Sequence, residues 1–251
     1  MDIVKPSWSA PKCVRVFNST RIGGYSQPPF DSMNLGLHVD DDADTVQKNR
    51  HYLQQQLRMP GSPLWMNQVH GTDVYRLEDK APTETIVADA ALTTVVNRVI
   101  TVMTADCLPV AITNESGTQV AVAHAGWRGL ANGVLQKTLA TFSAAERLYA
   151  WLGPAIGPQA FEVGQDVWEA FVSVNPDTGS AFEPIASTQG SPPKYLANIY
   201  QLARDALSQE HRIEISGGEC CTFTDKERFY SHRRDNIRSG RMALFAWLEP
   251  H

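Results

Sequence analysis

The sequence predicts an α+β protein with a mixed β-sheet. Short β-like runs crowd the middle of the chain, between about residues 64 and 125, while the expected helices are well separated. The regular alternation of strand and helix that marks a parallel α/β sheet is missing. No tandem repeat or low-complexity linker divides the 251 residues, so we expect a single domain spanning 1–251.

The first elements follow from local patterns. Residues 14–18 (VRVFN) are expected to form a strand, and residues 21–36 are rich enough in Gly, Pro, Ser and Asn to predict a structured loop. A helix is predicted over about 43–58, with Asp42 or Asp44 as its N-cap. Its apolar face consists of four residues at helical spacing: Val46, Tyr52, Leu53 and Leu57.

The middle and end of the chain supply the remaining elements. Six apolar runs predict strands: LWMNQV, DVYRL, TIVADAALTT, VITVMT, PVAIT and QVAVAH. A helix is expected at about 130–142, and LYAWLG (148–153) is expected to be a buried strand. Helices are predicted at 164–174 and 195–208, and RIEIS (212–216) is predicted to be a late strand.

Composition excludes several classes of protein. A net charge of −5 argues against nucleic acid or an anionic membrane as the partner. No apolar run approaches the roughly 20 residues that span a bilayer, and the N-terminus MDIVKPSWSAPK lacks the apolar segment of a signal peptide. Four cysteines without framework spacing fit a reducing compartment. We therefore expect a cytoplasmic protein.

The stretch TADCLPVAITNESGTQVAVAHAGWRG (104–129) carries the clearest chemical signal. Cys107 precedes one apolar run, His124 ends the next, and the polar turn NESG separates the runs. If the runs pair as a hairpin, both side chains lie at the same end, near His70 of NQVHG. Two His and one Cys form a zinc set whose fourth position stays open for catalysis. A thiolate–imidazole pair and a buried, inert Cys107 remain alternatives.

The residues that flank these three favour a functional site. Gly71, Gly126 and Gly129 permit positive φ and close approach of the backbone to a bound group. AGWRGL also begins a helix, whose first N–H groups can hold an anion beside Arg128. We therefore predict a catalytic role for Arg128.

Six motifs occur in the order NQVHGTDV, ADAALT, TADCLPV, AHAGWRGL, LGPAIGPQAFEVG and FYSHRRD…SGRMA. Together they closely resemble the YfiH-like, or laccase-domain, family, formerly called multicopper polyphenol oxidases. The resemblance runs from STRIGG and SMNLGLHVDDD to SGRMA and implies the αββα layered, CNF/YfiH-like fold of a group of proposed cysteine hydrolases. One departure is His232 in SHRRD, where the family often has an aromatic residue, so this histidine is not expected to be catalytic.

The resemblance also implies a site and an activity. Zinc would be held by His70, Cys107 and His124. The implied reaction is phosphorolysis of adenosine, inosine, guanosine or methylthioadenosine to the free base and ribose 1-phosphate, with adenosine deamination at the same site. The partners would be purine nucleosides and phosphate. Bacterial members are also linked to peptidoglycan editing.

Several arginines are candidates for binding the substrate. Arg21, in STRIGG, is predicted to contact an anion or ribose, although a surface turn would explain it equally well. Arg233 and Arg234 belong to a basic run with Arg238 and Arg241. Such runs are usually solvated, yet this one adjoins aromatic residues and is predicted to close a phosphate pocket.

Other side chains receive lesser roles. Asp73 and Asp106 are predicted to orient the ligand imidazoles or a bound water, and Glu162 is a candidate acid or base. Cys220-Cys221 is expected to pack in the core, since no CxxC motif frames it. A structural role is expected for His38.

Two other activities use the same residues. A blue copper ion would accept His70, Cys107 and His124 with a weak axial ligand. A copper polyphenol oxidase needs further imidazoles, however, and seven histidines without a His-x-His pair do not easily supply them. A metal-free hydrolase, with Cys107 as nucleophile and His124 as base, is the other alternative, and it suits peptidoglycan editing.

Overall fold

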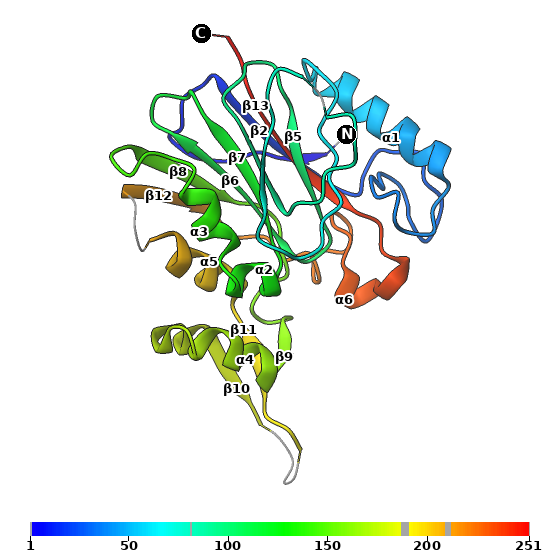
Figure 1. Ribbon diagram of the computed structural model, residues 1–251. Coiled ribbons are helices and arrows are strands. Elements are labelled where there is room, and N and C mark those ends of the chain that lie inside the picture. Colours follow the sequence, from blue (N-terminus) through cyan, green and yellow to red (C-terminus); the bar gives the residue numbers. More distant parts are fainter. Residues whose placement is uncertain (1, 81, 187–190, 209–211, 251) are drawn as a thin grey trace.

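Two β-sheets pack face to face, with helices on the outer side of each (Figure 1). The structure, a computed structural model, describes residues 2–80, 82–186, 191–208 and 212–250. The smaller sheet is antiparallel and has the order β1 (Ile3–Val4), β2 (Val14–Ser19), β13 (Met242–Leu248), β5 (Ile100–Thr104). The larger sheet has the order β12 (Arg212–Gly217), β8 (Arg147–Leu152), β6 (Leu108–Asn114), β7 (Val120–Ala125), β4 (Ala90–Thr93), β3 (Val74–Arg76). Its outer pairs β12–β8 and β3–β4 are parallel and the rest antiparallel, which confirms the expected mixed sheet.

Successive side chains of a strand point to opposite faces of the sheet, so one strand contributes to two separate cores. Along β13, Leu244, Ala246 and Leu248 pack between the two sheets. Alternate residues of the same strand pack outward with Leu53 of α1 (Ala43–Gln56). All seven residues of β13 are therefore buried. A third core joins the larger sheet to α2 (Trp127–Ala131), α3 (Val134–Leu139) and α5 (Ile199–Leu207), which completes the αββα layering implied by the resemblance.

The predicted helices differ from the observed ones where local chemistry intervenes. Helix α1 begins, as expected, after Asp42, whose side chain accepts a hydrogen bond from the Thr45 N–H. The helix expected at 130–142 is instead the pair α2 and α3, because Gly133 adopts φ +90° between them. Helix α5 starts after its Asn198 cap, four residues later than predicted.

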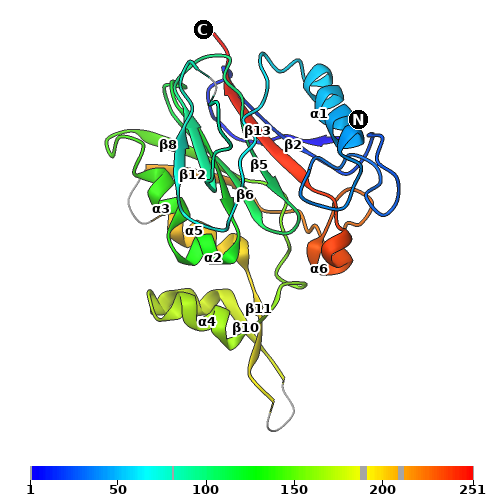
Figure 2. The same cartoon turned by 45° about the vertical axis from the view of Figure 1, so that its right-hand side comes forward.

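A small three-stranded sheet was not predicted from the sequence. It has the order β10 (Phe182–Ile185), β11 (Lys194–Ala197), β9 (Glu162–Gly164) and is accompanied by α4 (Gln165–Val172) and the 3₁₀ helix η1 (Pro176–Ala181). In Figures 1 and 2 this unit projects from the main body beyond α2 and α5. The run LWMNQV is also not a continuous strand, since only Leu64 and Asn67 form isolated bridges there.

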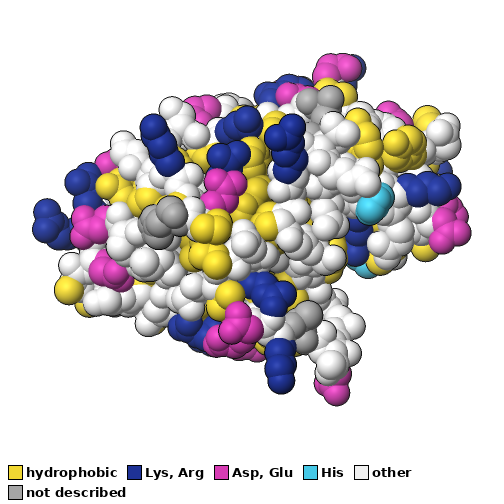
Figure 3. All heavy atoms as spheres, turned by 90° about the horizontal axis from the view of Figure 1, so that it is seen from above, with side chains coloured by type: hydrophobic (Ala, Val, Ile, Leu, Met, Phe, Trp, Pro, Cys, Tyr) yellow, Lys and Arg dark blue, Asp and Glu magenta, His cyan; other side chains and the backbone are white. Residues whose placement is uncertain are grey.

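The remaining helical turns, α6 (His232–Asp235) and η2 (Asn236–Arg238), precede β13. In the described part of the chain, no helix has both the length and the apolar character required to cross a bilayer. Figure 3 looks at the molecule from above and shows Lys and Arg side chains interspersed with Asp and Glu. No single sign of charge dominates that face.

Candidate metal site and cavity

The β6–β7 hairpin brings Cys107 and His124 together, as predicted. Leu108 pairs with Ala125 and Pro109 with His124, so Cys107, directly before β6, lies beside the end of β7. His70 arrives from the loop before β3. The potential ligand atoms of these three residues all lie within 4.8 Å of one another, and Cys107 Sγ is 3.8 Å from His70 Nε2. They are the one such group of His, Cys, Asp or Glu found among the described residues.

Asp89 fixes this geometry from beneath. Its fully buried carboxylate accepts hydrogen bonds from the N–H groups of Val69 (3.1 Å), His70 (2.9 Å) and Gly71 (2.7 Å). The fourth contact joins Asp89 Oδ1 to His124 Nδ1 at 2.8 Å. Because an ionised carboxylate only accepts, Nδ1 must carry a proton, and Nε2 is the nitrogen that can bind a metal, which displaces any proton there.

The prediction that Asp73 and Asp106 orient the imidazoles is wrong, because neither side chain contacts one. Asp73 is exposed and contributes only its backbone carbonyl, which accepts the N–H groups of Asp89 and Ala90. The carboxylate of Asp106 points to the C-terminal segment. Asp89 belongs to the motif ADAALT, and an acidic residue immediately before an apolar strand was the signal that could have identified it.

The three side chains form a mutually polarised group. Burial opposes ionisation of Cys107, but the neighbouring His124 and His70 lower its pKa to about 6. Burial likewise opposes the charge on His124, yet Cys107 and Asp89 raise the pKa of His124 to about 9. For Asp89, burial is outweighed by the hydrogen bonds from His124, Gly71 and Val69, which lower its pKa. Between about pH 6 and 9, thiolate and imidazolium therefore coexist in the metal-free site.

Close packing around the group requires glycine. A Cβ atom on Gly126 would lie 2.8 Å from His70 Cδ2 and 3.1 Å from Cys107 Sγ. One on Gly129 would lie 2.9 Å from the Gly71 carbonyl oxygen. These distances explain why the turn after His124 is rich in glycine.

The group opens into a cavity of about 550 Å³. Its polar lining includes His38, Gln68, Arg128, His232, Arg233 and Arg241. Its apolar lining includes Met66, Met103, Trp127, Ile156, Phe161 and Ile199. The cavity thus combines cationic and aromatic walls around one His–Cys–His group.

Of the four predicted arginines, two line this cavity. Arg128 stacks on Trp127, with Cζ 4.4 Å from the ring centroid, and Arg233 donates from Nη1 to the Glu162 carbonyl oxygen at 2.7 Å. In each case the guanidinium retains further donors beside the cavity. Glu162 itself is exposed, paired with Lys194, and outside the described lining.

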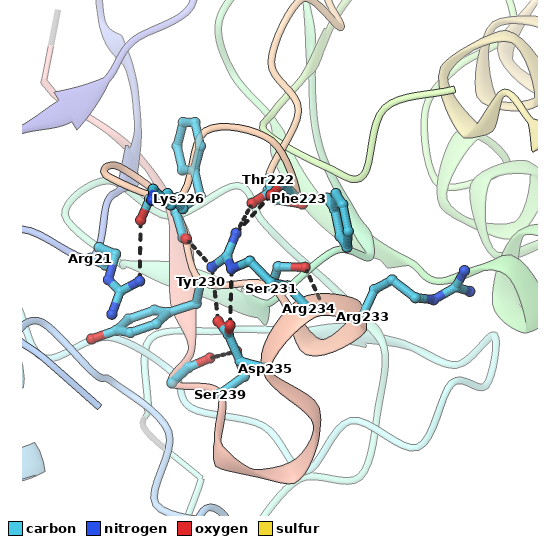
Figure 4. Close-up of polar contacts among 12 residues, drawn as sticks. Arg21, Thr222, Phe223, Lys226, Tyr230, Ser231, Arg233, Arg234, Asp235 and Ser239 are labelled. Atoms are coloured by element: carbon cyan, nitrogen blue, oxygen red, sulfur yellow. Dashed lines mark hydrogen bonds and ion pairs between the residues drawn. The ribbon is translucent and has the colours of Figure 1, made fainter. Parts of the chain in front are cut away.

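The described lining includes neither Arg21 nor Arg234, which hold loops together instead (Figure 4). Arg21 contacts Asp31 and the Lys226 carbonyl oxygen and lies over the Tyr230 ring. Arg234 donates to the carbonyl oxygens of residues 222, 223 and 229 and pairs with Asp235. A run of basic residues does not indicate which of its members turns inward.

Two further residues were misjudged or missed from the sequence, His38 and Gln68. His38 lines the cavity, although a structural role was expected; Arg241, a member of the predicted basic run, lines it as well. Gln68 anchors the loop of His70 to β5, because its amide donates to the Met103 carbonyl oxygen and accepts the Met103 N–H. Its position two residues before His70 was the available signal. Cys220 and Cys221 were expected to pack in the core and are only partly buried: Cys220 packs against the cluster that contains Phe229, and the Gly157 N–H lies 3.2 Å from Cys221 Sγ.

The donor set suits a transition metal. Two imidazoles and a thiolate, with one side open to a cavity, match the ligands of catalytic zinc and also suit copper. Structural zinc, in contrast, normally has four protein ligands.

Comparisons with known proteins agree with this picture over the whole chain. Curated relatives include purine nucleoside phosphorylase YfiH of Escherichia coli (strain K12), 49% identical over 247 residues and 98% of both chains. A purine nucleoside phosphorylase of Haemophilus influenzae is 46% identical over 250 residues, 99% of this chain and 100% of its own.

Solved structures share the fold. The Neisseria meningitidis protein NMB0706 superposes with a TM-score of 0.91 at 43% identity and covers 100% of both chains. YlmD from Geobacillus stearothermophilus gives a TM-score of 0.82 at 27% identity, covering 100% of this chain and 97% of its own. The family model described as multi-copper polyphenol oxidoreductase laccase matches residues 15–249. With its motifs, its fold and nearly its entire length in agreement, the chain belongs to this laccase-domain family.

Proposed function

We propose that the chain is a zinc-dependent purine nucleoside phosphorylase. The observation that carries the proposal is a three-residue His–Cys–His donor set that opens into a cavity of about 550 Å³. A catalytic metal needs such an open position, and the volume suits a nucleoside. The names of the relatives support the reaction class. The proposed substrates are adenosine, inosine, guanosine and methylthioadenosine.

His70, Cys107 and His124 would hold the zinc ion. When bound there, zinc supplies a Lewis acid that polarises an oxygen atom or lowers the pKa of a water molecule. Asp89 keeps the Nδ1 proton of His124 in place, so that Nε2 remains a donor to the metal.

In phosphorolysis an oxygen of phosphate forms a bond to C1′ of the ribose while the bond from C1′ to the purine N9 breaks. The products are the free base and ribose 1-phosphate. Arg128 and Arg233 present positive charge in the cavity for the phosphate, and Trp127 and Phe161 offer aromatic surface for the base. Orientation of the two substrates is thus the main contribution of these residues.

Deamination of adenosine belongs to the same proposal. When phosphate is absent, water is the nucleophile instead, and it attacks C6 of the purine rather than C1′ of the ribose. The amino group leaves as ammonia and inosine forms. The familiar zinc-deaminase signature H-x-E…P-C-x-x-C is missing from the sequence, so this activity would rest on a different site architecture.

One observation supports a second candidate, a Cys–His hydrolase without a metal. Cys107, His124 and Asp89 form a nucleophile–base–carboxylate series, and the lowered pKa of Cys107 favours a thiolate. Peptidoglycan editing would fit this chemistry. A multi-copper oxidase lacks comparable support, because the described residues contain one His–Cys–His group and no second cluster of imidazoles.

The decisive experiment measures bound metal and reaction products together. Adenosine is supplied to the purified protein with and without phosphate, before and after removal of the metal by a chelator. Under the proposal, adenine and ribose 1-phosphate form only with phosphate, and chelation abolishes both this reaction and deamination. Full activity after chelation, combined with complete loss after alkylation of Cys107, would instead establish the hydrolase. Oxidation of phenols without nucleoside cleavage would establish the oxidase.

A further inference from the structure

Asp106 joins the turn of Cys107 to a distant part of the chain. Its buried carboxylate accepts hydrogen bonds from Thr222 Oγ1 (2.6 Å), Ser231 Oγ (3.0 Å) and the Arg233 N–H (2.6 Å). Its backbone carbonyl accepts the N–H of Ile156 at 3.0 Å. Asp106 therefore ties the residue before the thiolate to three other segments, of which those of Ile156 and Arg233 line the cavity.

The backbone of Asp106 is also unusual. Its φ of +88° lies in the left-handed region, which Asp and Asn tolerate better than most residues with a side chain. Glycine would adopt the same φ without strain. The backbone conformation alone would favour glycine at this position. We attribute the presence of aspartate to its carboxylate, which accepts the three hydrogen bonds.

Two neighbouring arginines of this segment behave in opposite ways (Figure 4). Arg234 is saturated by carbonyl oxygens and Asp235, and its N–H donates to Ser231 Oγ. Arg233 points away from that cluster towards β9, with one hydrogen bond to the Glu162 carbonyl oxygen. Among the described residues it forms no ion pair. Its guanidinium lies over the Phe161 ring, with Cζ 5.7 Å from the centroid. Lys194, and to a lesser extent Arg233, lowers the pKa of Glu162, but Arg233 does not pair with that carboxylate, so donors remain for a ligand.

The geometry points to Asp106 as a positioning residue that holds the Arg233 backbone so that its guanidinium binds the phosphate co-substrate beside Cys107. The identity of the anion rests on the proposed phosphorolysis, whereas the coupling between the two residues does not. In this role the carboxylate acts through the N–H of Arg233, and Arg234 anchors the same turn through its own N–H to Ser231 Oγ.

A double-mutant cycle tests this coupling, with calorimetric binding of inorganic phosphate to the purified protein as the readout. Asp106→Gly removes the carboxylate and keeps the backbone conformation, and Arg233→Ala removes the guanidinium. Each change should weaken phosphate binding about tenfold, the order expected for one charge-assisted hydrogen bond. The double variant should bind no more weakly than Arg233→Ala alone, because Asp106 then has nothing left to position. Asp106→Asn retains one acceptor for the Arg233 N–H and should restore part of the affinity.

The matched control is Asp225→Ala, which removes another carboxylate that accepts a backbone N–H, that of Arg228, outside the described cavity lining. Its phosphate affinity should equal that of the wild type. Additive losses in the double variant, or no phosphate binding by the wild type, would overturn the inference. If Asp106→Gly does not fold, Asp106→Asn enters the same cycle, with a smaller loss that must again disappear in the Arg233→Ala background. A wild type that binds phosphate and shows the coupling but cleaves no nucleoside would refute the proposed function alone.

Discussion

Replacement of Asp89 by asparagine should weaken both the fold and the metal site. Each carboxylate oxygen of Asp89 accepts two hydrogen bonds: Oδ1 from His70 N–H and His124 Nδ1, and Oδ2 from the N–H groups of Val69 and Gly71. In the side-chain amide of the Asp89→Asn variant, an NH₂ group replaces one of these oxygens. If the NH₂ group replaces Oδ2, the partly buried N–H groups of Val69 and Gly71 lose their acceptor; if it replaces Oδ1, the His70 N–H and the His124 Nδ1–H do.

The magnitude follows from this count. A buried donor left without a partner costs about 1–3 kcal/mol. Two such donors, or one if His124 reverses its tautomer, should therefore lower the free energy of unfolding by about 1–6 kcal/mol, against the ~5–15 kcal/mol typical of a domain. If the amide NH₂ faces His124, the imidazole must reverse its tautomer, and Nε2 then carries the proton instead of a free lone pair. Zinc affinity should accordingly fall by about 10–100-fold.

Urea denaturation of the metal-free protein measures the first effect, and competition with a chromogenic chelator measures the second. Asp73→Asn is the matched control, because the Asp73 side chain is exposed and only its backbone carbonyl contacts this region. That variant should be indistinguishable from the wild type in both assays. If Asp89→Asn retains wild-type zinc affinity, the carboxylate does not set the tautomer of His124, and the reasoning fails.

Four further predictions concern the same region. In the metal-free protein, the rate of Cys107 alkylation by iodoacetamide should rise with a midpoint near pH 6 instead of the ordinary value of about 8.5; a midpoint above about 8 would exclude stabilisation of the thiolate by His124 and His70. Because the pKa of Cys107 is lower in the folded protein than in the unfolded chain, ionisation of this thiol stabilises the fold. That contribution is complete above the pKa of Cys107 in the unfolded chain and is lost as the pH falls through about 6. Urea titrations at several pH values can check this. Gly126→Ala should lower zinc affinity at least about tenfold with a destabilisation of about 1–3 kcal/mol, because the new methyl group displaces His70 and Cys107; unchanged affinity would show that the site is looser than its distances indicate. Arg234→Lys should lower the melting temperature by several degrees, about 2–4 °C per kcal/mol, and leave the phosphate affinity unchanged. A weaker phosphate affinity with an unchanged melting temperature would show that Arg234 binds the substrate.

Local sequence patterns were sufficient to predict the elements with a regular hydrophobic pattern or a helix-capping residue. The β6–β7 hairpin and helix α1 were predictable because apolar runs of adequate length are bounded by a polar turn and by Asp42. Strand β13 was overlooked because both of its faces are buried, so its sequence MALFAWL does not alternate. The three strands of the small sheet have only three or four residues each, too few to show a period.

The candidate site was predictable to the extent that its residues carry their own chemistry. A cysteine and two histidines are obvious ligands, and nearby glycines reveal crowding. Asp89 was missed because its role exists only once folding brings the N–H groups of residues 69–71 within hydrogen-bond distance of its carboxylate. Arg233 and Arg234 are adjacent in sequence, and only the direction of each side chain separates a cavity residue from an anchor.

The two buried carboxylates explain how the site can be assembled before a metal binds. Asp89 fixes the His70 loop and the ring of His124, while Asp106 fixes the turn that bears Cys107. Asp89 works mainly through the backbone N–H groups of residues 69–71, and Asp106 through two hydroxyl groups and the N–H of Arg233. Because little of the chain remains to be ordered, metal binding should contribute less to folding here than in a zinc finger, where the site forms only with the ion. Metal removal should therefore abolish activity while leaving most of the melting temperature in place.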